Sequence, residues 1–268
     1  MFGRRPDGTL IRSLSSIRAF MPFISPRRND SLVLYSMDID VDAAFALLDR
    51  VNVHRAADRQ ITLFHVYLCA CARSLRERPF INRFTAGGRL WQRNHVAITF
   101  SAMQKIVDGS PMLTLKRIFP EGESLEEMVD SLLDRLSRRR GGEVTRSDKE
   151  VHFFLRMPPF IVRAGVWLMH QANQLGAMPR WMIDDDPLFT SIFVANLGSV
   201  GLDSGYHHLW EWGTCSLFAV MGRVEERADG TRFMTVRYTY DERVEDGLYA
   251  AGAMAVIKDG VESPGSLG

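Results

Sequence analysis

The hydrophobic pattern changes period within one stretch near the end of the chain, and this change constrains the fold more than any other feature. Phe233 to Tyr240 alternates bulky apolar or aromatic residues with smaller polar ones, which is the pattern of a half-buried strand. From Gly247 onward apolar residues recur at helical spacing, and Asp246 is placed to cap the helix that they imply. The intervening turn carries four charged residues, Asp241, Glu242, Arg243 and Glu245. A tight strand-to-helix turn is a favourable place to hold a reacting group rigidly.

The remaining chain alternates between strand and helix patterns. We expect strands at 31–40, 90–100, 111–118 and 216–224, and helices at 41–51, 61–78 and 121–140. Thr62 is expected to cap the second helix, and His65, one turn further on, is interpreted as a packed residue rather than a catalytic one. Neither an internal repeat nor a domain linker is evident. The pattern therefore predicts one α/β domain.

Two segments stand apart from this pattern. Residues 1–30 are rich in Arg, Pro and Ser, and we expect an arm with one short helix around Ser13 to Phe20. Residues 151–183 are strongly apolar, but basic residues and the Pro158-Pro159 pair interrupt them, so we expect two helical pieces forming a hairpin or lid. Burial of this lid between subunits is favoured over attachment to a membrane surface.

Composition excludes several classes of protein. Lys plus Arg (33) nearly balance Asp plus Glu (32), which argues against a nucleic-acid binder. The N-terminus has no apolar segment typical of a secretory signal, and no run of about 18 uncharged apolar residues occurs. The three cysteines do not make a disulfide framework. These features indicate a protein of the reducing cytoplasm, with membrane binding not expected.

Two motifs resemble one family. Residues 241–247, Asp-Glu-Arg-Val-Glu-Asp-Gly, resemble the Asp-His-Arg-x-x-Asp-Gly signature that ends the catalytic domain of the dihydrolipoamide acyltransferases. These are the acyltransferase components of 2-oxoacid dehydrogenase complexes and relatives of chloramphenicol acetyltransferase. Every fixed position matches except one, because Glu242 stands where the family carries its catalytic histidine.

The second motif lies within Leu188 to Gly201, which is similar to the family's Phe-Thr-Ile-Ser-Asn-Leu-Gly strand and turn. In that family a hydroxyl here stabilises the oxyanion of the tetrahedral intermediate. The hydroxyl position is occupied by Ala195, and Ser199 would replace it only if the turn were remodelled. The resemblance thus implies a substrate and oxyanion region at Ala195, Asn196, Gly198 and Ser199.

The resemblance extends from about Ile17 to Pro264 and implies a two-layer α/β sandwich with a mixed sheet. It also implies trimers whose active sites lie between subunits, and coenzyme A as a substrate. Arg18 would inherit the family's arginine that pairs with the aspartate of the terminal motif, here Asp246, in a buried or half-buried ion pair. We expect the acyltransferase-like domain to span 31–264, with a helical insertion at about 143–183. The family's lipoyl and subunit-binding modules do not fit in the arm, so no covalent lipoyl group is expected and any lipoyl group would come in trans.

Acyl transfer needs a base, and the sequence offers two sources of one. Glu242 is a weaker base than histidine, whereas His207 and His208 would supply an imidazole. Adjacent residues of an extended segment point to opposite faces, so we expect at most one of these histidines to face a shared cleft. A metal site made by this pair with Glu211 is not favoured, because no third ligand shares a face with them.

This reasoning favours two functions over a third, a membrane-surface protein that would use residues 151–183. The first is a stand-alone acyltransferase of altered mechanism that moves an acyl group between coenzyme A and a thiol or other small acceptor. The alternative is a non-catalytic, acyltransferase-like trimer that binds an acyl-CoA or a protein partner.

Overall fold

A mixed β-sheet forms the centre of the computed structural model, which describes residues 5–103, 112–141, 154 and 156–267. Within these residues the sheet has six strands in the order β2-β9-β8-β7-β5-β6. β7 runs parallel to both of its neighbours, and the other pairs are antiparallel. The strands are β2 (Leu32–Asp40), β5 (Val96–Met103), β6 (Met112–Phe119), β7 (Ile192–Asn196), β8 (Leu217–Glu226) and β9 (Arg232–Asp241). The expected mixed sheet is therefore confirmed.

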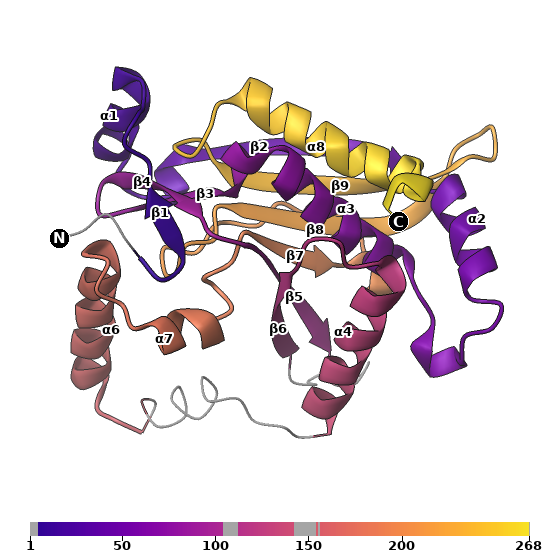
Figure 1. The fold of residues 1–268 in the computed structure, drawn as a ribbon, viewed down its shortest axis with the longest axis horizontal. Helices are drawn as coiled ribbons and strands as arrows, with labels where there is room; N and C mark the ends of the chain where they lie inside the picture. Colours follow the sequence, from indigo (N-terminus) through magenta and orange to yellow (C-terminus); the bar gives the residue numbers. More distant parts are fainter. Residues whose placement is uncertain (1–4, 104–111, 142–153, 155, 268) are drawn as a thin grey trace.

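Helices pack on one face of this sheet (Figure 1). They are α2 (Asp42–Val51), α3 (Leu63–Glu77), α4 (Leu125–Arg140) and α8 (Gly247–Glu262). Alternate residues of β9 enter the core between sheet and helices, because successive strand side chains point to opposite faces; Met234, Val236 and Tyr238 are fully buried there. The Tyr67 hydroxyl of α3 donates to the Tyr238 hydroxyl at 3.1 Å and joins the two layers. The two-layer α/β arrangement is confirmed.

The starts of the helices follow their capping residues. Asp246 caps α8, as predicted, and its carboxylate accepts from the Tyr249 N–H at 2.9 Å. Thr62 caps α3, also as predicted. In α4, Ser124 and Glu127 satisfy each other's backbone N–H in a capping box, so the helix begins at Leu125 rather than near residue 121.

One predicted strand is divided in two. We expected a continuous strand from Leu90 to Phe100, but the chain forms β4 (Arg89–Arg93) and β5, which belong to different sheets. In the described residues β4 lies between β1 (Gly8–Leu10) and β3 (Arg83–Ala86) in a three-stranded sheet. The break falls at Asn94, whose N–H donates to the Asp7 carbonyl at 3.2 Å. This bond ends one sheet before the next begins.

Residues 5–30, the described part of the N-terminal arm that we expected, pack on the rest of the chain. Besides β1 they contain α1 (Ser16–Ile24), which begins after the Ser15 cap and extends beyond the expected Phe20. Arg5 and Asp7 are buried, with the Arg5 Nε 2.9 Å from the Asp7 carboxylate. The terminal nitrogens of Arg5 donate to the main-chain and side-chain oxygens of Asn173, each at 2.7 Å. The N-terminal segment therefore fixes a helix of the insertion in place.

That insertion contains α6 (Pro159–Gln174) and α7 (Arg180–Asp185). The Pro158-Pro159 pair begins α6, because a proline at the first helical position lacks only an N–H that would be unpaired anyway. α6 ends before Gly176, whose φ of +71° is in the left-handed region that ends helices. Residues 142–153 of the predicted insertion lie outside the described residues. Within the described chain, no helix combines the length and the apolar character needed to cross a membrane.

We expect Asp7→Asn to lower the free energy of unfolding by about 3 kcal/mol, because it removes the carboxylate that faces two buried guanidinium groups, Arg5 and Arg93. Urea unfolding followed by circular dichroism measures the change. Asp30→Asn is the matched control, since Asp30 is exposed. Equal effects of the two substitutions would contradict the structural role of the N-terminal segment.

Candidate functional site

The terminal turn leaves β9 at Asp241 and enters α8 at Gly247. The Asp241 N–H donates to the Ser216 carbonyl at 3.0 Å, and the Glu242 N–H donates to the Ser31 carbonyl at 2.9 Å. The Val244 N–H returns to the Asp241 carbonyl at 3.1 Å and closes the turn. The backbone that carries Glu242 is therefore fixed from both sides.

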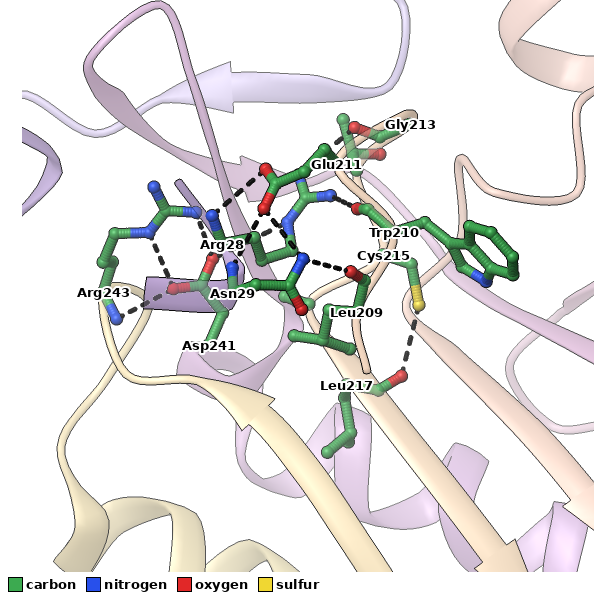
Figure 2. A network of polar contacts seen from close by, with 12 residues as sticks. Arg28, Asn29, Leu209, Trp210, Glu211, Gly213, Cys215, Leu217, Asp241 and Arg243 are labelled. Carbon is green, nitrogen blue, oxygen red and sulfur yellow. Dashed lines mark hydrogen bonds and ion pairs between the residues drawn. The ribbon is translucent and has the colours of Figure 1, made fainter. Parts of the chain in front are cut away.

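Asp241 and Arg243 form a buried two-bond ion pair at the base of this turn (Figure 2). The Arg243 Nε and Nη2 each donate to the Asp241 carboxylate at 2.8 Å, and neither side chain is more than 4% exposed. The remaining nitrogen of Arg243 donates to the carbonyls of Ser25 and Pro26. The pair therefore ties the end of α1 to the end of β9.

Arg28 lies beside the same carboxylate, 3.8 Å from it, and joins a third segment to this network. Its guanidinium donates to the carbonyls of Trp210 and Gly213, and the main-chain N–H of Arg28 donates to the Glu211 carboxylate (Figure 2). Burial lowers the pKa of Arg28, and the charge of Asp241 opposes that shift. Burial acts to raise the pKa of Glu211, but hydrogen bonds from the main-chain N–H groups of Asn29 and Arg28 outweigh it, so the pKa is lowered.

Arg18 reaches the terminal turn, as predicted, but its main acidic partner differs from the predicted one. Its Nη1 donates to the Glu242 carbonyl at 2.7 Å, and its Nη2 lies 3.0 Å from Glu245. Asp246 is 3.9 Å away and its side chain is 62% exposed, because its carboxylate turns outward to cap α8. Glu245 binds Arg83 at 2.8 Å with its other oxygen. The predicted ion pair of Arg18 with Asp246 is therefore present only at long range, and the closer, half-buried partner is Glu245.

Glu242 itself is exposed, and its carboxylate has no hydrogen bond or ion pair within the described chain. The other carboxylates of the turn, those of Asp241, Glu245 and Asp246, each accept at least one N–H. Tyr240 precedes the turn, and burial followed by the charges of Glu242 and Asp246 raises the pKa of its phenol. A protonated hydroxyl therefore accompanies a free carboxylate at this corner.

The second motif forms a 3₁₀ turn, Gly198–Val200, directly after β7. The Asn196 amide oxygen accepts from the Ser199 N–H at 3.1 Å, and the Ser199 hydroxyl donates to the Asn196 carbonyl at 2.8 Å. A Cβ on Gly198 would lie 2.3 Å from the Gly222 carbonyl oxygen, so only glycine lets the turn press against β8. The Ser199 hydroxyl therefore donates its hydrogen bond within the turn.

The two motifs lie far apart in one chain. Asp241 lies level with Ser216, whereas Asn196 pairs with Met221. Five residues of extended chain separate these levels, which corresponds to about 16 Å. Glu242 therefore does not meet the second motif of its own chain.

Ala195 points to the sheet face opposite the helices, where it packs on an apolar cluster with Phe193, Phe218 and Val220. His207 lies on that same cluster, with its ring 4.1 Å from the Phe218 ring. The structure thus brings His207 and Ala195 to one face of the sheet, opposite the helices.

The two histidines do not point to opposite faces. Their rings stack at 4.5 Å with 21° between the planes, and the His207 Nδ1 lies 2.7 Å from the His208 carbonyl oxygen. The segment is not a regular strand, so the alternation that we assumed does not apply. Within the described residues, no group of three His, Cys, Asp or Glu side chains is arranged to hold a metal ion.

An open cavity of about 590 Å³ lies on the helix side of the sheet, where the second motif forms part of its wall. Asn196, Gly198 and Ser199 line it together with His65. Sequence reasoning interpreted His65 as a packed residue, and it is only 6% exposed, yet it reaches this cavity. No periodicity signals this, because the cavity is formed by elements that are distant from one another in the sequence.

Comparison with known proteins gives a fold but no close relative. No protein-family model and no curated protein sequence matches the chain. A truncated catalytic core of the 2-oxoacid dehydrogenase multienzyme complex from Thermoplasma acidophilum is 14% identical, with a TM-score of 0.63 over 95% of this chain and 98% of that one. The dihydrolipoamide acetyltransferase of Azotobacter vinelandii is 15% identical, with a TM-score of 0.63 over 96% and 93%. That enzyme was investigated for the role of a serine, a histidine and an asparagine in its catalytic mechanism.

A chloramphenicol acetyltransferase is 12% identical, with a TM-score of 0.55 over 95% of this chain and 98% of that one. The chain therefore has the chloramphenicol acetyltransferase-like fold of dihydrolipoamide acyltransferase cores. The resemblance that the two motifs indicated is confirmed at the level of the fold.

Glu245 and Asp246 are adjacent acids with different expected effects on stability. Glu245→Gln breaks a largely buried pair with Arg83 and Arg18, so we expect a loss of about 3 kcal/mol in the free energy of unfolding. Asp246→Asn keeps a favourable cap and removes only an exposed charge, so we expect a change below about 0.5 kcal/mol. Thermal unfolding of both variants measures the two losses of stability. A larger loss for Asp246→Asn than for Glu245→Gln would show that Asp246 is the main partner of Arg18.

Proposed function

We propose that this protein is an acyltransferase that moves an acyl group from a coenzyme A thioester to a thiol or another small acceptor, with Glu242 as the base. The observation that carries the proposal is the terminal turn, where the backbone of Glu242 is fixed by Arg18 and Ser31 while its carboxylate remains without a partner in the described chain. A rigid support with a free reactive group is what positioned acid–base catalysis requires. A lipoyl group carried by another protein is one such acceptor. The proposal includes no lipoyl group attached to this chain.

The proposed reaction needs one base and balances without any further reagent. The acceptor thiol gives its proton to the Glu242 carboxylate and attacks the thioester carbonyl. As the tetrahedral intermediate collapses, coenzyme A leaves as a thiolate and takes that proton. The reference pKa is about 4.3 for glutamate and about 6.5 for histidine, so the carboxylate is weaker by up to about 3 kcal/mol of basicity. Brønsted slopes below one make the loss of rate smaller than this.

The site would be shared between subunits of a homotrimer. The Glu242 turn and the Asn196 turn of one chain lie about 16 Å apart along β8. Each site would therefore combine the Glu242 turn of one subunit with the Asn196 turn of a neighbouring subunit. Exposed apolar side chains support association: Leu34 lies on the edge strand β2, and Ile17, Phe20, Phe23 and Ile24 lie on α1. The insertion adds Phe160, Trp167 and Leu168 of α6 to the apolar surface available for burial.

A second candidate function, acyl-CoA or partner binding without turnover, rests on a different observation. Ala195 has no hydroxyl, and the Ser199 hydroxyl donates to the Asn196 carbonyl instead of facing a substrate. Loss of one oxyanion donor costs a factor of about 10² to 10³ in rate. A protein that keeps the fold and the cavity without this donor fits a binding or scaffolding role.

We expect Glu242→Gln to lower the release of coenzyme A from acetyl-CoA by at least about 10²-fold, because the amide cannot accept the acceptor's proton. The assay measures free thiol with dihydrolipoamide and with a small amine as acceptors. Glu121→Gln is the matched control, since Glu121 is exposed and lies at the start of the segment before α4. A double His207→Ala/His208→Ala variant tests the imidazole as the base.

Loss of activity only in the double histidine variant would assign the base to the imidazole. If wild-type turnover does not exceed the buffer rate for any acceptor while calorimetry still shows acyl-CoA binding, the second candidate function replaces the first.

We expect light scattering to show a homotrimer at micromolar concentration. Leu34→Lys places a charge on the exposed face of the edge strand β2, so this variant should dissociate toward the monomer. Val53→Lys is the control, because Val53 is also exposed but lies in the connection after α2. A monomeric wild-type protein would contradict both the trimer and the shared site.

A further inference from the structure

The cavity beside the second motif is walled by apolar side chains from both layers of the fold. The walls come from α3, α4, β5, β8 and β9, and include Phe64, Phe100, Leu132, Leu136, Met221 and Met234. Charged residues in the lining, Asp58 and Arg140, are exposed, so they belong to its mouth. A volume of about 590 Å³ is within the usual range for sites that bind small molecules.

The walls are fixed by packing against one another and against the main core. Phe64 packs edge-to-face on Phe100, with ring centroids 5.4 Å apart and 72° between the planes. Leu132, Met221 and Met234 are at most 2% exposed and belong to the main core. An apolar cavity with walls of this kind is suited to an aliphatic group, because filling it removes apolar surface from water.

One polar side chain with a defined hydrogen-bonding state reaches the cavity. The Nδ1 of His65 accepts from the Thr62 N–H at 3.1 Å, so the proton of the neutral ring is on Nε2. Burial, aided by the charge of Arg55, lowers the pKa of His65 to about 4, and the ring is uncharged at neutral pH. Nε2 has no hydrogen-bond partner among the described residues. The cavity therefore contains a neutral N–H donor.

We propose that this cavity holds the acyl chain of the substrate, an aliphatic chain with an uncharged carbonyl, and that the His65 Nε2–H donates a hydrogen bond to the carbonyl oxygen. The inference rests on the proposed function, since it names the class of acyl group that the acyltransferase takes. A neutral donor and the lack of a charged group in the interior, among the described lining residues, favour a thioester over a free carboxylate, which would need a buried cation.

Titration calorimetry with acetyl-, butyryl-, hexanoyl- and octanoyl-CoA tests the cavity. We expect the Kd to fall about fourfold for each added methylene until the cavity is full, which is the ratio that corresponds to about 0.8 kcal/mol per buried CH₂. Ala102→Phe fills the cavity from β5 and should remove the dependence on chain length while leaving the Kd for acetyl-CoA unchanged. Ala228→Phe, on the exposed turn after β8, is the matched control.

The outcomes separate this inference from the proposed function. Equal affinity for all chain lengths would overturn the acyl cavity but leave acyl-CoA binding intact, whereas no binding at any length would overturn the proposed function itself. Free octanoate that binds as tightly as octanoyl-CoA would overturn the preference for an uncharged carbonyl. If Ala102→Phe does not fold, Leu136→Trp fills the same cavity from α4 and takes its place.

His65→Gln tests the donor. Glutamine at this helical position keeps an oxygen that accepts the Thr62 N–H, as in a capping box, but removes the imidazole Nε2–H. We expect an unchanged melting temperature, about two- to tenfold weaker binding of octanoyl-CoA, and a carbonyl stretch of the bound thioester at higher frequency than in the wild type. An infrared band at the wild-type position would overturn the role of His65.

Discussion

The buried ion pair between Asp241 and Arg243 is the interaction on which the candidate site depends. Its two charges are removed from water, so they are stable only because they bind each other and the neighbouring carbonyl groups. That requirement brings in the carbonyls at the end of α1 and, through Arg28, the 209–213 segment. Three stretches of sequence are thereby fixed around the turn that presents Glu242. Asp241 and Arg243, which the family signature shares with this chain, therefore have a role in the fold that does not depend on catalysis.

Much of the fold could be predicted because it depends on local signals. The change of period at Tyr240, the cap at Asp246 and the cap at Thr62 each act within a few residues, and each is present in the structure. The division between β4 and β5 was missed because a hydrogen bond from Asn94 to the distant Asp7 decides it. The second helical break, at Gly176, was missed because a glycine inside a polar segment is a weak signal on its own.

The candidate site was predictable only in part, because contacts between residues distant in the sequence also determine how its side chains are arranged. Sequence placed Arg18 at the terminal turn but assigned its charge to Asp246, since nothing in the sequence shows which of two adjacent acids faces inward. The stacked arrangement of His207 and His208 required knowledge that their segment is irregular. His65 was given a packing role because its reach into a cavity depends on helices and strands distant in sequence. Motifs identified the positions, whereas tertiary contacts determined what each side chain does.

The contact between Arg5 and Asn173 has a consequence for how the chain acquires its structure. The two residues are 168 positions apart, so the buried guanidinium leaves the ribosome long before its amide and carbonyl partners are made. Contacts of such large sequence separation form slowly, because the chain must close a long loop before they contribute. The three-stranded sheet and α6 therefore complete each other late in folding.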